Sequence, residues 1–160
     1  MNPKIKSAAA LSRLFRKSQA QGKKIVFTNG CFDVIHYGHV AYLRKAKTFG
    51  DLLVIGLNTD ASVRRLKGKS RPVNCERDRA EVLSEFSCID YVTFFREDTP
   101  LNLIRKLKPD VIVKGADWKL RDIVGFDFVK SYGGNVKRIH YVPGHSTTGT
   151  LKKLACRAGK

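Results

Sequence analysis

Short apolar runs alternate along the chain with stretches in which apolar residues recur every three or four positions. The runs predict five buried strands, at residues 23–30, 51–58, 89–95, 110–115 and 136–142. The helical periodicity predicts helices at 7–21, 40–50, 60–66, 75–86, 99–107 and 122–132, and a terminal helix from Thr147. Strands that alternate with helices favour a parallel sheet with helices on both faces, which is an α/β fold.

The chain length fits one folded unit. With 160 residues we expect a single domain over 1–160, with a basic N-terminal helix at about 1–22 and a core at about 23–156. No apolar run is long enough to cross a bilayer, and the first twenty residues carry scattered charges that do not suit a secretory signal. These features predict a cytoplasmic protein.

The net charge is strongly positive, at +17, from 31 Lys and Arg against 14 Asp and Glu. Residues 1–24 and 137–160 hold no acid, so much of the excess lies near the two ends. A charge of this size attracts phosphate-bearing partners in general, and the basic ends fit either solvated termini or a weak nucleic-acid patch.

The four cysteines, Cys31, Cys75, Cys88 and Cys156, form no CxxC pair. Their scatter argues against a zinc site or a disulfide framework, and we expect reduced thiols and no protein metal site.

The segment GCFDVIHYGH, residues 30–39, places two histidines where the first strand gives way to a helix. His36 and His39 share one face of the first turn if the helix begins near His36, and Gly38 leaves room for a close approach. Such a pair suits metal binding, acid–base chemistry or donation to phosphate oxygens, or it simply begins a helix. A third metal ligand is missing nearby, and helix starts bind anions, so phosphate binding is favoured.

The stretch FTNGCFDVIHYGHVAYLRKAK resembles the cytidylyltransferase-like nucleotidyltransferases, which carry an HxGH motif. Within that group the chain is similar, over about residues 24–155, to heptose 1-phosphate adenylyltransferases, which occur alone or as the carboxyl-terminal half of bifunctional ADP-heptose synthases. The similar strings are GLNTDASVRRLKG, RPVN with DRAEVL, EDTPLNLIRKLKPDVIVKGADW, VGFDFVKSYGG and STT. CTP-using relatives have Arg-Thr-Glu-Gly before Ser-Thr-Thr, whereas this chain has VPGH.

The resemblance implies a Rossmann-like nucleotidyltransferase domain that joins ATP and D-glycero-β-D-manno-heptose 1-phosphate into ADP-heptose and pyrophosphate. Attack on the α-phosphorus needs positioning and charge stabilisation rather than a protein nucleophile. We therefore predict His36, His39 and Lys114 as catalytic residues, although Lys114 could instead be a solvated lysine. Mg²⁺ is expected to arrive with ATP, and Asp33 is expected to support the turn rather than bind metal.

Two further groups of residues are predicted to bind the substrates. Those expected to contact the nucleotide are Phe27, Thr28, Asn29, Gly30, Cys31 and Phe32 through their backbones, with Gly115, Asp117, Ser146, Thr147 and Thr148. Those expected to hold the sugar phosphate are Asn58, Asp60, Arg64, Lys69, Arg71 and Asn74. The basic loop at 67–74 could also be a solvated run of charge.

The resemblance also implies partners. We expect a homodimer, a separate heptose 7-phosphate kinase upstream in the pathway, and no membrane or nucleic-acid partner. The alternatives are a related HxGH enzyme that uses CTP or another phosphorylated substrate, such as glycerol 3-phosphate, and a nucleic-acid-binding protein on the same fold. The chain lacks the aromatic-rich basic strands of an RNA-recognition module, which disfavours the last of these.

Overall fold

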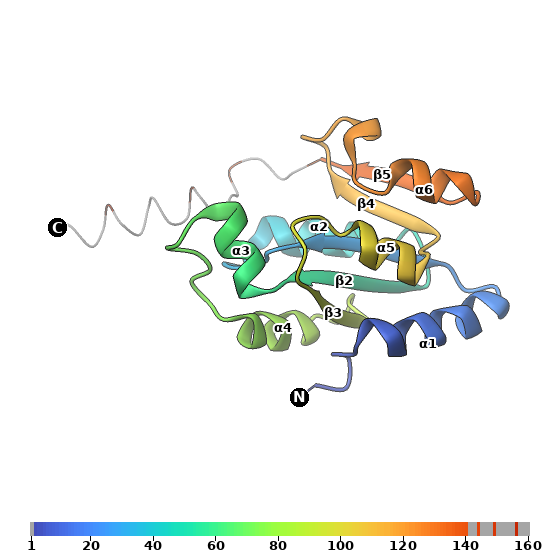
Figure 1. The fold of residues 1–160 in the computed structure, drawn as a ribbon, viewed down its shortest axis with the longest axis horizontal. Coiled ribbons are helices and arrows are strands. Elements are labelled where there is room, and N and C mark those ends of the chain that lie inside the picture. The colour runs from blue at the N-terminus through green and yellow to red at the C-terminus, as the bar shows by residue number, and fades with distance from the viewer. Residues whose placement is uncertain (1, 141–143, 145–148, 150–155, 157–160) are drawn as a thin grey trace.

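The computed structural model describes residues 2–140, 144, 149 and 156. Five strands form one parallel sheet in the order β3-β2-β1-β4-β5 (Figure 1). Their bounds are β1 Ile25–Gly30, β2 Leu52–Asn58, β3 Tyr91–Phe95, β4 Val111–Gly115 and β5 Asn135–Ile139. The predicted five-stranded parallel sheet is confirmed.

Each predicted helix up to residue 132 is present, with shifted ends. The helices are α1 Ala8–Ala20, α2 Tyr37–Lys47, α3 Asp60–Lys67, α4 Glu76–Ser84, α5 Leu101–Leu107 and α6 Phe126–Ser131, with a 3₁₀ turn η1 at Leu120–Asp122. Ser7 caps α1 by accepting the Ala10 N–H at 3.2 Å. The helix expected at 122–132 is shorter because Gly125, with φ of 90°, interrupts the backbone before α6. The predicted terminal helix lies outside the described residues.

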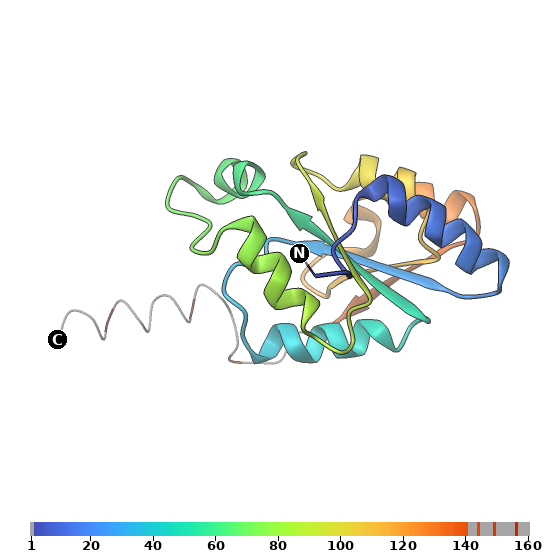
Figure 2. The same ribbon diagram turned by 90° about the horizontal axis from the view of Figure 1, so that it is seen from below.

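Helices cover both faces of the sheet (Figures 1 and 2). One face packs the buried side of α2 and α4 on Val26 of β1 and Leu53 of β2. The opposite face packs α1, α5 and α6 on Phe27 of β1 and Val54 of β2. Neighbouring residues of a strand point to opposite faces, so these nearly continuous apolar strands are buried on both sides.

The N-terminal segment belongs to the sheet region rather than standing apart from it. Ile5 forms a parallel bridge with Val92 of β3, and the Lys6 N–H donates to the Val92 carbonyl at 3.0 Å. Leu11 and Phe15 of α1 are buried in the core beside α5. None of the helices in the described part of the chain combines the length and apolar character needed to cross a membrane.

The strand order places a reversal at β1. The chain passes from β1 to β2 on one side, and β4 later pairs with β1 on the other side. Ligands of open parallel sheets bind beyond the carboxyl ends of the strands at such a point. The residues at the ends of β1 and β4 are therefore expected to bind the ligand.

Candidate active site

The two histidines meet at the start of α2, directly beyond the end of β1. His36 is the N-cap residue, with extended backbone angles, and His39 lies in the first helical turn. Their ring centroids are 3.9 Å apart and the ring planes differ by 33°. The predicted placement of both rings on one face of the first turn is confirmed.

The hydrogen bonding of His39 fixes which of its nitrogens can donate. The His36 backbone N–H donates to His39 Nδ1 at 3.4 Å, so the neutral ring carries its proton on Nε2. Burial, followed by the nearby charges of His36 and Lys67, lowers the pKa of His39 to about 4. Near neutral pH, His39 is therefore an uncharged ring with an Nε2–H donor.

The turn between β1 and α2 forms one wall beside His39. Phe32 has a φ of 44°, a left-handed conformation that non-glycine residues rarely adopt, and its ring lies 5.4 Å from that of His39. A Cβ added to Gly30 would lie 3.1 Å from the Phe32 ring, so a glycine there lets the ring pack closely. Burial raises the pKa of the neighbouring Cys31 thiol despite the cations Lys67, Arg79 and Arg71.

The strands β1 and β4 pair over only two positions, Val26 with Val111 and Phe27 with Ile112. Phe27 is thus paired on both sides within the sheet and fully buried, which places it before the edge where a nucleotide is expected. Lys114, two residues after Ile112, donates from Nζ to the Asn29 carbonyl at 3.0 Å. The strand ends are therefore joined by a side chain in place of further backbone pairing.

Lys114 is a cation held in a mostly buried position. Burial lowers its pKa to about 8, while Cys31 and Asp117 act in the opposite direction. Because it bonds to Asn29 across the gap, it is not a solvated strand-end lysine. Gly115 is buried beside it, and Asp117 is exposed on the loop that follows β4.

The basic loop between α3 and α4 is fastened to the turn after β1 by Asp33. The Asp33 carboxylate accepts from Arg71 Nε at 2.6 Å and from the backbone N–H groups of Val73 and Asn74 at 2.8 and 2.9 Å. Asn74 also donates from Nδ2 to the Asp33 carbonyl at 2.8 Å. The loop is therefore anchored around Arg71, while residues 67–70 are exposed, and Asp33 supports this turn as expected.

The remaining residues predicted to hold the sugar phosphate differ in their surroundings. The side chain of Asn58 is buried and donates to Ser62 Oγ at 2.9 Å, and Asp60 forms an ion pair with Arg79 at 2.7 Å. Arg64 and Lys69 are exposed. The binding roles of these residues stay predictions.

Arg79 of α4, which is not among the predicted site residues, joins four segments around the site. Its guanidinium donates to the carbonyls of Cys31, Asn58 and Asn74 and to the Asp60 carboxylate, and only 2% of the residue is exposed. The signal was present in the sequence, since position 79 shares the inward stripe of α4 with Ala80 and Leu83. Lys67 was also missed, although its charge acts on His39.

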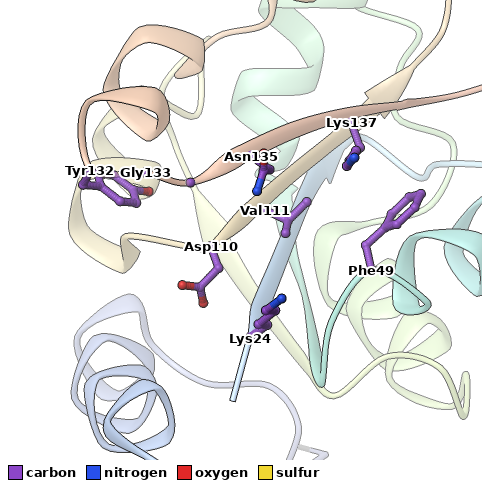
Figure 3. Close-up of a pocket in the computed structure, with 9 residues that line it drawn as sticks. Lys24, Phe49, Asp110, Val111, Tyr132, Gly133, Asn135 and Lys137 are labelled. Carbon is purple, nitrogen blue, oxygen red and sulfur yellow. The ribbon is translucent and has the colours of Figure 1, made fainter. Parts of the chain in front are cut away.

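A cavity of about 450 Å³ lies at the opposite, amino-terminal edge of the sheet (Figure 3). Asp110, Asn135 and Lys24 line it near the starts of their strands, with Tyr132 on one side and Lys137 on the other. The Asp110 carboxylate already has a hydrogen-bond partner within the chain, because it accepts the Ile25 N–H at 2.7 Å. This cavity is remote from His36 and His39.

Two further predictions concern the end of the chain and a protein metal site. Ser146, Thr147 and Thr148 lie outside the described residues. Within residues 2–140 and the isolated described positions after them, no three His, Cys, Asp or Glu side chains gather as a metal-binding group.

The parallel sheet that reverses at β1 and the histidine pair at the start of α2 agree with the Rossmann-like nucleotidyltransferase class that the HxGH motif indicates. Residues 27–145 match the family described as Cytidylyltransferase-like, and the chain belongs to that family. The predicted family resemblance is confirmed.

Individual relatives agree with this assignment. The chain is 54% identical to the Bifunctional protein HldE of Geobacter sulfurreducens and 56% identical to those of Geobacter metallireducens and Campylobacter concisus, each over 151 residues. These alignments cover 94% of this chain but only 31% of each relative. A crystal structure described as the lipopolysaccharide core biosynthesis protein from Thermoplasma volcanium matches with a TM-score of 0.62 and 30% identity, covering 76% of this chain and 98% of that one.

Proposed function

We propose that this chain is an adenylyltransferase that joins ATP and D-glycero-β-D-manno-heptose 1-phosphate to give ADP-heptose and pyrophosphate. The observation that carries the proposal is that a neutral His39, in the first turn of α2 after β1, and the mostly buried cation Lys114, near the end of β4, both lie at the carboxyl-terminal edge of the sheet. Both groups donate hydrogen bonds, and donors in a mostly buried site stabilise phosphate charge strongly.

The choice of sugar rests on sequence similarity. The strings GLNTDASVRRLKG and KGADW resemble heptose 1-phosphate adenylyltransferases. The high identity to bifunctional HldE proteins and the Thermoplasma protein's description in lipopolysaccharide core biosynthesis support the same choice. The absence of Arg-Thr-Glu-Gly before Ser146 favours ATP over CTP.

The reaction is an in-line displacement at the α-phosphorus of ATP. An oxygen of the sugar phosphate forms the new bond as the bond to the β-phosphate oxygen breaks, and pyrophosphate leaves with that electron pair. His36 and His39 donate to the phosphate oxygens as negative charge builds on them, and Lys114 offsets charge beside the β1–β4 gap. The chain's role is to hold and orient both substrates.

Arg71 is the basic-loop residue that is anchored beside the turn after β1, and we assign it to the sugar phosphate. Its Nε is held by Asp33, while Nη2 is buried without a hydrogen-bond partner among the described residues. The Asp33 contact holds the guanidinium beside the turn after β1, where its positive charge would attract the sugar phosphate. Mg²⁺ is expected to bind the triphosphate oxygens and neutralise their charge, because the donors gathered here suit phosphate rather than the metal.

The test is pyrophosphate release by the purified chain with Mg²⁺, each nucleoside triphosphate in turn, and the β-heptose 1-phosphate. Release that requires ATP and the sugar phosphate together supports the proposal, and His39→Ala should lower turnover about 10²- to 10³-fold. Release with CTP or with glycerol 3-phosphate instead would replace the substrate assignment. Near-normal turnover in His39→Ala would remove His39 from the mechanism.

The predicted homodimer and cytoplasmic location remain part of this proposal. Light scattering on the purified chain measures the first, and cell fractionation measures the second. A monomer at working concentrations would contradict the dimer without affecting the proposed chemistry.

A further inference from the structure

Tyr42 reaches from α2 into the gap between β1 and β4. It follows His39 by three residues on the same helix and is 9% exposed. Its hydroxyl donates to the Val113 carbonyl at 3.0 Å and lies 2.8 Å from Thr28 Oγ1. Because the Tyr42 hydrogen is used on Val113, the Thr28 hydroxyl donates to the Tyr42 oxygen.

These contacts fall where the next rung of the β1–β4 ladder would be. The last backbone pair is Phe27 with Ile112, so continued pairing would match Thr28 with Val113. The ladders on the other sides of β1 and β4 continue to Gly30 and Gly115, so only the shared side is interrupted. The side chain of Tyr42 stands in place of the missing pair.

Lys114 also bridges the two strands with its side chain, one residue further toward their carboxyl ends. Continued register would place Asn29 opposite Lys114, and the Lys114 ammonium bonds to the Asn29 carbonyl. Two successive side-chain bridges therefore set the spacing of the strand ends. The Tyr42 bridge comes from α2, the helix that begins with the two histidines.

We propose that Tyr42 is a positioning residue whose hydroxyl fixes the separated ends of β1 and β4 relative to α2, and thereby fixes His39 relative to Lys114. The inference deepens the proposed function and rests on it for its catalytic consequence. A single buried hydroxyl with partners on two strands can do this because each partner lies in a rigid element.

The variant Tyr42→Phe keeps the ring and removes the hydroxyl. Thr28 and Val113 then lose a buried partner, and the gap can widen and admit water. We expect kcat to fall about 10- to 100-fold, since small misplacements of reacting groups have effects of that size. KM for ATP should stay unchanged, because the lost interaction concerns alignment rather than ground-state binding.

Tyr132→Phe is the matched control. Tyr132 donates to the Pro109 carbonyl at 2.7 Å, so the control also removes one hydroxyl-to-carbonyl bond, at the opposite edge of the sheet. Because Tyr132 is more exposed and makes one such bond, the control should lower stability by less than Tyr42→Phe and leave kcat unchanged. Urea denaturation measures the stability of both variants.

A second readout needs no substrate. In chains carrying ¹³C-labelled lysine, the Lys114 resonance is assigned by its loss in Lys114→Met and titrated by NMR. The midpoint should be near 8 in the wild type and in Tyr132→Phe, and should rise toward 10.5 in Tyr42→Phe as water enters the gap around Lys114, Cys31 and Asp117.

The outcomes separate the two proposals. An unchanged Lys114 midpoint and an unchanged kcat in a folded Tyr42→Phe would overturn the positioning role. A Tyr42→Phe chain that fails to fold while Tyr132→Phe folds would also overturn it, because the hydroxyl would then be a requirement of folding. If the wild type shows no adenylyltransferase activity but the Lys114 midpoint still rises in Tyr42→Phe, the positioning role is upheld and the proposed function is refuted.

Discussion

Replacing Asp33 by Asn tests whether this carboxylate fastens the basic loop to the turn after β1. The Asp33 side chain is 1% exposed and accepts three hydrogen bonds, from Arg71 Nε and from the N–H groups of Val73 and Asn74. Asparagine has nearly the same shape but only one acceptor oxygen and no charge. At least one buried donor, and the Arg71 charge, therefore lose their partner.

The magnitude follows from the kind of contact that is lost. A hydrogen bond to a charged group contributes about 1.5–3 kcal/mol, and removing one partner of a buried ion pair costs about 3–5 kcal/mol. Because the loop can re-solvate part of what it exposes, we expect Asp33→Asn to lower the unfolding free energy at pH 7 by an amount at the low end of that range, about 3 kcal/mol. That is a large share of the roughly 5–15 kcal/mol that holds a domain together.

The contribution of Asp33 to stability should also depend on pH in a definite direction. Burial alone would raise the pKa of Asp33, but the N–H groups of Asn74 and Val73 and the Arg71 guanidinium together lower it below its ordinary 3.8. A lowered carboxyl pKa stabilises the fold above pH 3.8, and that contribution disappears as pH falls through the lower folded-state pKa. The difference between wild type and Asp33→Asn should therefore shrink below pH 3.8.

Urea denaturation at pH 7 and at a series of acidic pH values measures this difference. Asp98→Asn is the control, because Asp98 pairs with Arg65 on the surface, where such pairs contribute about 0–1 kcal/mol. A loss in Asp33→Asn no larger than that of Asp98→Asn at pH 7 would refute the reasoning, and so would a difference that stays constant on acidification.

Three further predictions concern charged groups around the site. Arg79→Met should cost about 3–5 kcal/mol in urea denaturation, because it leaves the Asp60 carboxylate and several carbonyls without their buried partner. The kcat/KM of the wild type should decline above pH 8, where Lys114 loses its proton, and in Lys114→Arg the pH–rate profile should show that decline at higher pH. Since the pKa of His39 is about 4 in the fold against an ordinary 6.5, the urea midpoint should fall as pH drops from 6.5 toward 4, and His39→Gln should flatten that part of the curve.

The amino-acid sequence alone predicted the helices and strands and the placement of the two histidines on one face of a helical turn. Apolar runs closed by turn or charged residues mark strands, because burial on both faces leaves little room for polar residues. The spacing of His36 and His39 follows from helix geometry, which acts over a single turn. Such features depend on residues near one another in the chain, so the pattern alone predicts them.

Helix ends were less predictable. The helix expected at 122–132 begins only at Phe126, because Gly125 takes a left-handed conformation that periodicity does not reveal. The pairing of Ile5 with Val92 was also not foreseen, because the short segment before α1 carries no strand pattern of its own and acquires one only beside the open edge of β3.

The contacts that complete the site were decided by the tertiary structure. Asp33 meets Arg71 across 38 residues, Tyr42 meets Val113 across 71, and Lys114 meets Asn29 across 85. The Tyr42 and Lys114 contacts depend on the strand order, which brings β4 beside β1 and lets their ladder end after two pairs. The chain therefore determines locally which side chains can do chemistry, while the packing of distant segments determines which of them are held together, because burial and register are properties of the whole sheet.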